Sequence, residues 1–129
     1  MKHQFRYLMI LLLSWSCNEL KPGPIEDFIP GTYIRFSKHE FGTEYDTLVI
    51  TMQNASVKEY TILRKWKYER MLDGSVVEPE YKRLTTSGIY NAKQKLLEEK
   101  GSGDVFSFDV KGKSLFNGPT TYRKLNLNL

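Results

Sequence analysis

The chain has 129 residues, of which 40% are hydrophobic, 13% aromatic and 26% charged, and its formal net charge is +4. This length accommodates one domain. The single cysteine excludes an intramolecular disulfide and a cysteine-cluster metal site, and only two histidines are present for catalysis or metal binding. The composition therefore predicts a globular protein without a metal or other cofactor, and it argues against most enzyme chemistries.

The first sixteen residues have the three-part pattern of a secretory signal peptide. Lys2 and Arg6 precede six consecutive apolar residues at positions 8–13, and two serines follow within the next three residues. The apolar run is shorter than the ~20 residues of a membrane-spanning helix. Residues 1–16 are therefore predicted to be a cleaved export signal. Its removal leaves 17 basic and 15 acidic side chains, a balance that gives little support to nucleic-acid binding.

The only cysteine follows this signal directly. The segment Leu13-Ser14-Trp15-Ser16-Cys17 resembles the lipobox of bacterial lipoproteins, with Trp15 at a position where a small residue is usual. The resemblance implies that Cys17 becomes the first mature residue and carries diacylglycerol and an N-acyl chain, because stable anchoring needs more than one acyl chain. In such lipoproteins an aspartate directly after the lipidated cysteine marks retention in the inner membrane. Asn18 stands at this position, so the resemblance favours the outer membrane. The alternative is an ordinary signal peptide followed by a free thiol.

Residues 17–30 are predicted to form a tether between the lipid and the folded domain. Three prolines lie within nine positions of this segment, and proline disfavours both helix interiors and central strands. We therefore expect the lipidated cysteine and an extended stalk over 17–30, and one folded β domain over 31–129.

From Gly31 onward, apolar and polar residues alternate with period two between turn sequences. The predicted strands cover residues 32–37, 46–53, 59–71, 80–92, 105–110, 114–116 and 121–127. Segment 92–100 is rich in helix-forming residues but lacks an apolar stripe, and it is interpreted as a strand pair or a turn with at most one helical turn. The sequence thus predicts an all-β fold, an antiparallel up-and-down meander of seven or eight strands forming a small closed or partly open barrel.

The predicted domain opens with Pro30-Gly31-Thr32-Tyr33 and closes with Tyr122-Arg123-Lys124-Leu125. These two ends resemble those of the small lipocalin-like domains of bacterial lipoproteins of the Bacteroidota type. In lipocalins a basic residue near the end of the barrel packs over the opening aromatic residue. The resemblance therefore implies a structural closure pair of Tyr33 and Arg123, held by a cation–π interaction. It implies a fold and not a ligand.

One face of the predicted strand 59–71 carries two aromatic residues flanked by arginines, and it is a candidate binding patch formed by Arg64, Trp66, Tyr68 and Arg70. Such interleaving can bind a nucleic-acid strand, a glycan or an anionic lipid surface. In the alternative interpretation, the two aromatic side chains fill the barrel. The two arginines then lie at its rims and pair with acids such as Glu69 or Glu80.

The sequence contains no phosphate-binding glycine loop, no His-Glu-x-x-His and no Gly-x-Ser-x-Gly motif. His39, the only histidine after the signal, is predicted to be an exposed loop residue. We therefore expect a monomeric, non-catalytic binding or accessory module of the bacterial envelope, anchored by its lipid and in contact with envelope proteins. A carrier of a small apolar ligand and a small envelope hydrolase are the alternatives. Large inward side chains would fill an eight-stranded barrel, leave no room for a ligand and so favour protein contact. The large side chains that we expect to point inward are Trp66, Tyr68, Phe106 and Phe108.

Overall fold

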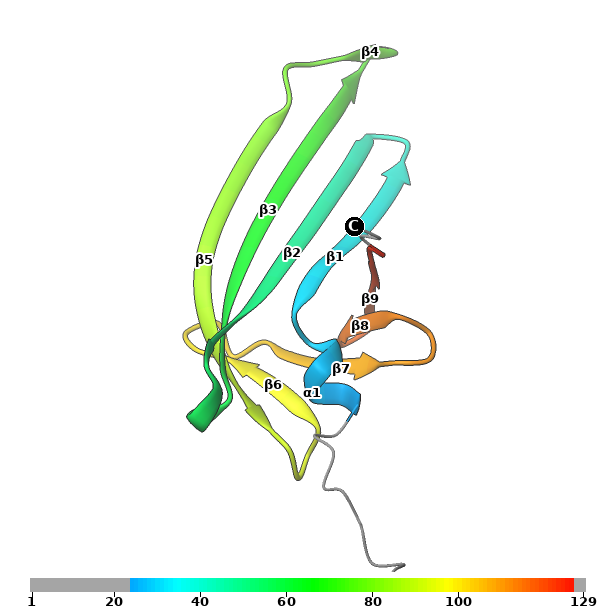
Figure 1. Cartoon of the computed structure of the whole chain (residues 1–129). Helices are drawn as coiled ribbons and strands as arrows, with labels where there is room; N and C mark the ends of the chain where they lie inside the picture. The colour runs from blue at the N-terminus through cyan, green and yellow to red at the C-terminus, as the bar shows by residue number, and fades with distance from the viewer. Residues whose placement is uncertain (1–23, 127–129) are drawn as a thin grey trace, which may run out of the picture.

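The computed structural model describes residues 24–126, so the predicted signal peptide, Cys17 and the first part of the tether lie outside the described residues. Eight antiparallel strands form a closed barrel, and a ninth short strand, β4, pairs with the end of β3 (Figure 1). The elements are α1 (Pro24–Phe28), β1 (Gly31–His39), β2 (Gly42–Asn54), the 3₁₀ turn η1 (Ala55–Val57), β3 (Glu59–Leu72), β4 (Ser75–Val76), β5 (Glu80–Asn91), β6 (Leu96–Glu99), β7 (Val105–Asp109), β8 (Ser114–Asn117) and β9 (Thr120–Lys124). The prediction of an all-β antiparallel barrel is confirmed.

The strand order is β2-β1-β9-β8-β7-β6-β5-β3-β4, and the pairing of β2 with β3 closes the barrel. The segment rich in helix formers contains a turn followed by the single strand β6, and no helix. Two features override the helical propensity there. The side-chain oxygen of Asn91 accepts hydrogen bonds from the backbone N–H groups of Lys93 and Gln94, which holds the turn. Leu97 is then fully buried between β5 and β7.

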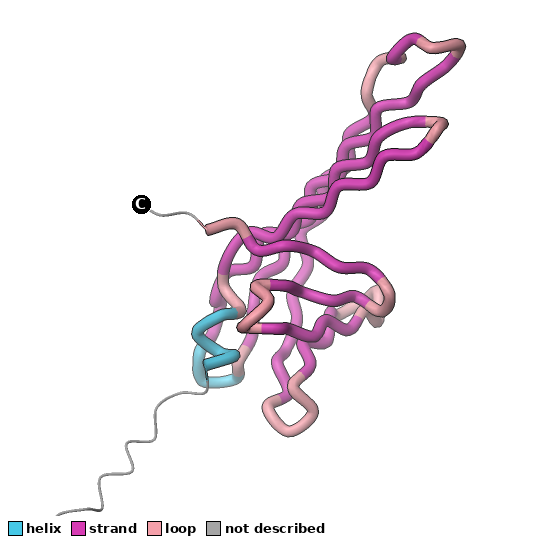
Figure 2. Tube along the Cα trace, turned by 90° about the vertical axis from the view of Figure 1, so that its right-hand side faces the viewer, coloured by secondary structure: helices cyan, strands magenta, loops and turns pink. Residues whose placement is uncertain are grey.

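The strands differ greatly in length. Strands β2, β3 and β5 have 13, 14 and 12 residues, whereas β6 to β9 have four or five. The short strands pair only with the lower parts of β5 and β1, so the upper parts of four strands continue past the barrel (Figure 2). We call this projecting part, residues 35–47 and 64–84, the sheet extension. At ~3.4 Å per residue, β3 rises about 27 Å from Arg64 to Leu72.

The hydrophobic core fills the closed part of the barrel. Its buried members are Ile29, Tyr33, Leu48, Ile50, Tyr60, Ile62, Tyr90, Leu97, Phe106, Leu115 and Tyr122. Four tyrosines are thus the largest side chains of the interior. Trp66 and Tyr68, which the sequence places inside the barrel in one interpretation, are half-buried and lie beyond it on the same face of β3. The period-two pattern identifies the face of a strand, but it does not indicate where the neighbouring strands end.

The predicted tether is wrong for its last residues. Helix α1 covers the end of the barrel next to η1, where the carboxylate of Glu26 lies 2.7 Å from the ammonium of Lys58. Ile29 is fully buried, and Phe28 packs on the core. Pro24 stands in the first turn of α1, where proline removes no intrahelical hydrogen bond. Residues 24–30 therefore belong to the folded domain.

The predicted closure pair is off by one residue. The ammonium of Lys124 lies 5.6 Å from the Tyr33 ring centre and 4.1 Å from that of Phe28, and it donates a hydrogen bond to the Phe28 carbonyl. Arg123 is exposed. Successive side chains of a strand point to opposite faces, so Lys124 shares the inner face with Tyr122 whereas Arg123 points outward. Burial lowers the pKa of Lys124.

Candidate functional site

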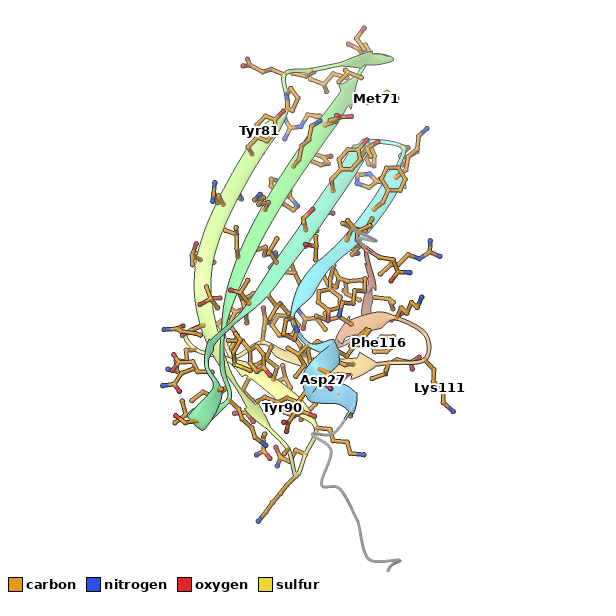
Figure 3. The ribbon with its side chains drawn as sticks, in the orientation of Figure 1. Asp27, Met71, Tyr81, Tyr90, Lys111 and Phe116 are labelled. Carbon is orange, nitrogen blue, oxygen red and sulfur yellow. The ribbon has the colours of Figure 1, made fainter. Side chains whose placement is uncertain are left out.

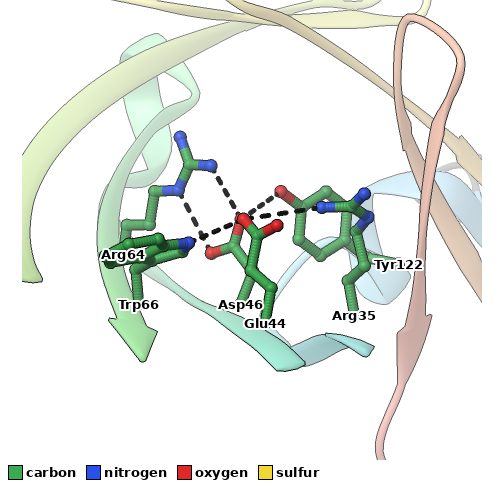
Figure 4. A network of polar contacts seen from close by, with 6 residues as sticks. All are labelled: Arg35, Glu44, Asp46, Arg64, Trp66 and Tyr122. Carbon is green, nitrogen blue, oxygen red and sulfur yellow. Dashed lines mark hydrogen bonds and ion pairs between the residues drawn. The ribbon is translucent and has the colours of Figure 1, made fainter. Parts of the chain in front are cut away.

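The sheet extension begins at a buried ionic network that spans three strands at the mouth of the barrel (Figure 4). Asp46 on β2 is 1% exposed and accepts hydrogen bonds from Arg64 Nε at 3.1 Å and Nη2 at 2.7 Å. Its Oδ2 also accepts a hydrogen bond of 2.7 Å from the hydroxyl of Tyr122 on β9. Hydrogen bonding to this carboxylate raises the pKa of Arg64. The network separates the apolar core below from a polar and aromatic surface above.

A second polar layer lies on the same face, two residues farther along β2 and β3 toward the tip of the extension. Glu44 accepts a hydrogen bond of 2.6 Å from the indole Nε1 of Trp66, and its Oε1 lies 3.8 Å from Nη1 of Arg35 (Figure 4). Glu44 and Trp66 come from adjacent strands, and the indole ring is therefore fixed relative to the sheet. A ring held in this way loses little conformational entropy when it binds a ligand.

Aromatic rings continue this inner face toward the tip of the extension. The Trp66 and Tyr68 rings stack at 5.7 Å, and the Tyr68 and His39 rings stack at 6.1 Å. The Lys82 ammonium lies 5.0 Å from the centre of the Trp66 ring. Beside Trp66 is a slot of ≈ 310 Å³ lined by Arg64, Trp66, Lys82 and Leu84. A surface of this kind offers apolar contact and positive charge to a bound group.

The candidate patch from the sequence lies on this face. Arg64, Trp66 and Tyr68 are neighbours on it, and Arg70 lies farther out, exposed and opposite Gly42 of β2. The expected pairing of Arg64 with Glu69 or Glu80 is wrong, because its partner is Asp46 of the adjacent strand. His39 is exposed at the end of β1, at the turn to β2. That the patch binds a ligand stays a prediction.

Sequence reasoning missed a second cluster on the outer face of the extension. The Lys67 ammonium lies 5.3 Å from the Tyr45 ring and 5.9 Å from the Tyr81 ring, and these tyrosines occupy the register positions on either side of Lys67. The three residues contribute to a groove of ≈ 520 Å³. Alternation along each strand does place all three on one face. Their proximity depends on a cross-strand register that single-strand patterns do not specify.

Exposed apolar side chains are concentrated on the extension. Among residues 24–126, nine of the fourteen large apolar side chains that are exposed lie there: Phe36, Phe41, Tyr45, Met71, Leu72, Val76, Val77, Tyr81 and Leu84. Tyr81 is 70% exposed, and it stands on β5 near the tip (Figure 3). Exposed apolar side chains that gather on one part of a domain are typical of interaction sites.

Within residues 24–126, no group of three or more His, Cys, Asp or Glu side chains is placed to hold a metal ion together. In the same part of the chain, no helix is long and apolar enough to cross a membrane. Comparisons with protein-family models, with curated proteins and with solved structures found no match to this chain. The resemblance to lipocalin-like lipoproteins therefore stays a prediction.

Proposed function

We propose that this chain is a non-catalytic binding or accessory module of the bacterial envelope, anchored through lipid on Cys17, which contacts other envelope proteins through the sheet extension. The observation that carries the proposal is the contrast between the two parts of the domain. The barrel interior is filled by eleven buried apolar side chains, whereas the extension presents aromatic and apolar side chains to solvent. A module that binds proteins needs such an exposed surface.

The placement of the elements supports this proposal. Helix α1, the first described element, lies at the opposite end of the domain from β4 and the tip of the extension (Figure 1). A lipid anchor preceding α1 would thus leave the tip directed away from the anchoring membrane. We further propose that this membrane is the outer membrane. We also propose that the domain is a lipocalin-like barrel whose interior is filled by packed side chains. A carrier function is less favoured, since Tyr33, Tyr60, Tyr90 and Tyr122 occupy the interior.

Lipidation is tested by the intact mass of the protein purified from membranes of its native host. We expect a polypeptide that begins at Cys17 and carries the added mass of a diacylglyceryl group and one acyl chain. A Cys17→Ser variant should lose these groups and leave the detergent phase in a two-phase partition. A mature protein with an unmodified thiol at position 17 would contradict the anchoring proposal.

The binding surface is tested by chemical crosslinking in native membranes, purification, and mass spectrometry of both proteins and lipids. Replacing Phe36, Leu72 and Tyr81 by serine should abolish recovery of the crosslinked envelope protein. The matched control replaces three exposed apolar residues of the barrel, Val57, Ile89 and Val105, by serine, and it should retain the partner. Recovery of a tightly bound apolar small molecule from the wild type, the extension variant and the control variant alike would instead support the carrier alternative.

A further inference from the structure

We propose that the free edge of β5 binds an acidic, extended segment of the partner protein as an additional strand of the sheet extension. This inference rests on the proposed function and names the chemistry of the partner. Strand addition requires an unpaired sheet edge with outward backbone donors and acceptors, and side-chain features that select the incoming segment. The upper half of β5 provides both.

The unpaired edge runs between Glu80 and Ser87. Strand β5 pairs with β3 along residues 80–89, but β6 pairs only with residues 88–91. The carbonyl of Ser87 accepts a hydrogen bond of 2.8 Å from the N–H of Lys100. The backbone groups of Ser87 therefore point away from β3. Residues 81, 83 and 85 have the same parity as Ser87, so their N–H and C=O groups point away from β3. Above β6, these six groups have no neighbouring strand among residues 24–126.

The charge around this edge favours an acidic segment. On the outer face, Lys65 lies directly opposite Arg83, and like charges in this position destabilise a sheet. Within residues 24–126, Lys65, Lys82 and Arg83 make no ion pair within 4.0 Å. Carboxylates directed to the outer face of an added strand would neutralise Lys65 and Arg83 and relieve the repulsion between them.

Both faces beside the edge can receive side chains of an added strand. Alternate residues of such a strand point to the inner and the outer face. On the inner face, they would meet the slot formed by Arg64, Trp66, Lys82 and Leu84. On the outer face, they would meet Arg83 and the groove beside Tyr81. The arrangement therefore favours acidic residues toward the outer face, in alternation with apolar residues that contact Trp66 and Leu84 on the inner face.

A second copy of this chain is a poor occupant of the same edge. Antiparallel pairing of two β5 edges about Arg83 would bring Lys82 and Arg83 of one copy next to those of the other. Basic residues on an edge strand are a known means of preventing such self-association. Among residues 24–126, the free edge of β1 is shorter, because only Phe36 and Lys38 have outward backbone groups above β9.

The test uses the full-length protein in detergent and a fluorescent, end-blocked peptide of four Glu-Val repeats, with binding followed by anisotropy. We expect the peptide to bind and a Lys-Val peptide not to bind. Thr85→Pro removes one outward N–H without removing a bond to β3, so it should preserve the circular dichroism spectrum and the melting temperature. It should weaken binding at least tenfold. Thr85→Ala keeps the N–H and should bind as the wild type does, and Lys38→Pro on the β1 edge should also bind normally.

Further arms of the experiment distinguish backbone pairing from charge as the source of affinity. A Glu-Val peptide with N-methylated glutamates keeps its charge but loses backbone donors, and it should not bind. Arg83→Glu should weaken binding at least tenfold. Equal binding of the two Glu-Val peptides, or unchanged binding by folded Thr85→Pro, would overturn the proposal, as would the absence of binding at millimolar peptide. The proposal would also be overturned if the wild type formed a dimer that Thr85→Pro abolishes. It would be overturned as well if the wild type and Thr85→Pro did not bind the peptide but bound equally to phosphatidylglycerol vesicles.

Failure of this inference is distinguishable from failure of the proposed function. If the serine variants of the extension lose the envelope partner but the peptide does not bind, the extension is the contact surface and the β5 edge is not its mode of recognition. If the serine variants retain the partner, the proposed function itself fails.

Discussion

Removing Arg64 is expected to destabilise the protein by about 2–3 kcal/mol, although part of its side chain reaches solvent. Breaking a fully buried ion pair costs about 3–5 kcal/mol, because an unpaired charge is left in the interior. Asp46 is buried, but Arg64 is 42% exposed, so solvent screening reduces the expected cost. Urea unfolding of Arg64→Met, followed by circular dichroism, measures the effect.

Two comparisons make this prediction specific to the network. Tyr122→Phe removes one hydrogen bond to the same carboxylate and should cost about 1.5–3 kcal/mol. The triple variant Asp46→Leu, Arg64→Met, Tyr122→Phe should be more stable than Arg64→Met alone, since it leaves no unpaired buried charge. Lys100→Met, which breaks an exposed ion pair with Glu59, should cost less than about 1 kcal/mol. Equal losses in Arg64→Met and Lys100→Met would show that the network contributes little.

The protein is expected to lose stability steeply above pH 10. Burial raises the pKa of four interior tyrosines, which are Tyr33, Tyr60, Tyr90 and Tyr122. A raised pKa means that the folded state keeps protons that the unfolded chain releases. The stabilising contribution is therefore complete below the unfolded value of about 10 and is lost as the pH rises toward the folded value. Each such tyrosine adds a loss of up to about 1.4 kcal/mol per pH unit.

Lys124 acts in the opposite direction. Its lowered pKa means that the unfolded chain binds the additional proton, so its contribution to stability is complete above the unfolded pKa of about 10.4 and is lost as the pH falls through the folded pKa. Urea unfolding between pH 8 and pH 11.5 should thus give a maximum near pH 10 and a steep decline above it. Tyr33→Phe should reduce the slope of the decline. A free energy of unfolding that stays constant from pH 10 to pH 11.5 would contradict the raised pKa of the buried tyrosines.

Much of the fold follows from local pattern. Alternation places Leu48, Ile50 and Ile62 on inward faces, and the structure buries all three. Asp73-Gly74, a dipeptide typical of hairpin turns, forms the turn after β3. These features succeed because turn chemistry and period-two alternation are properties of adjacent residues.

Features that depend on register between distant residues were not predictable in the same way. Asp46 reads as an ordinary polar residue at the start of a strand, and its role depends on Arg64 and on Tyr122, which is 76 positions away. The unequal strand lengths that create the sheet extension, and the docking of α1 on the barrel, are likewise non-local. Lys124 rather than Arg123 packs over Tyr33 because strand parity, and not motif position, sets side-chain direction.

Site-specific photocrosslinking in living cells of the native host tests most directly whether the sheet extension is the binding surface. A benzophenone amino acid would replace Phe36 or Tyr81 on the extension, and Val57 or Ile89 on the barrel. We predict crosslinks to an envelope protein from the two extension positions and none from the two barrel positions. Crosslinks confined to Val57 and Ile89, or the absence of protein crosslinks from all four positions, would contradict the account.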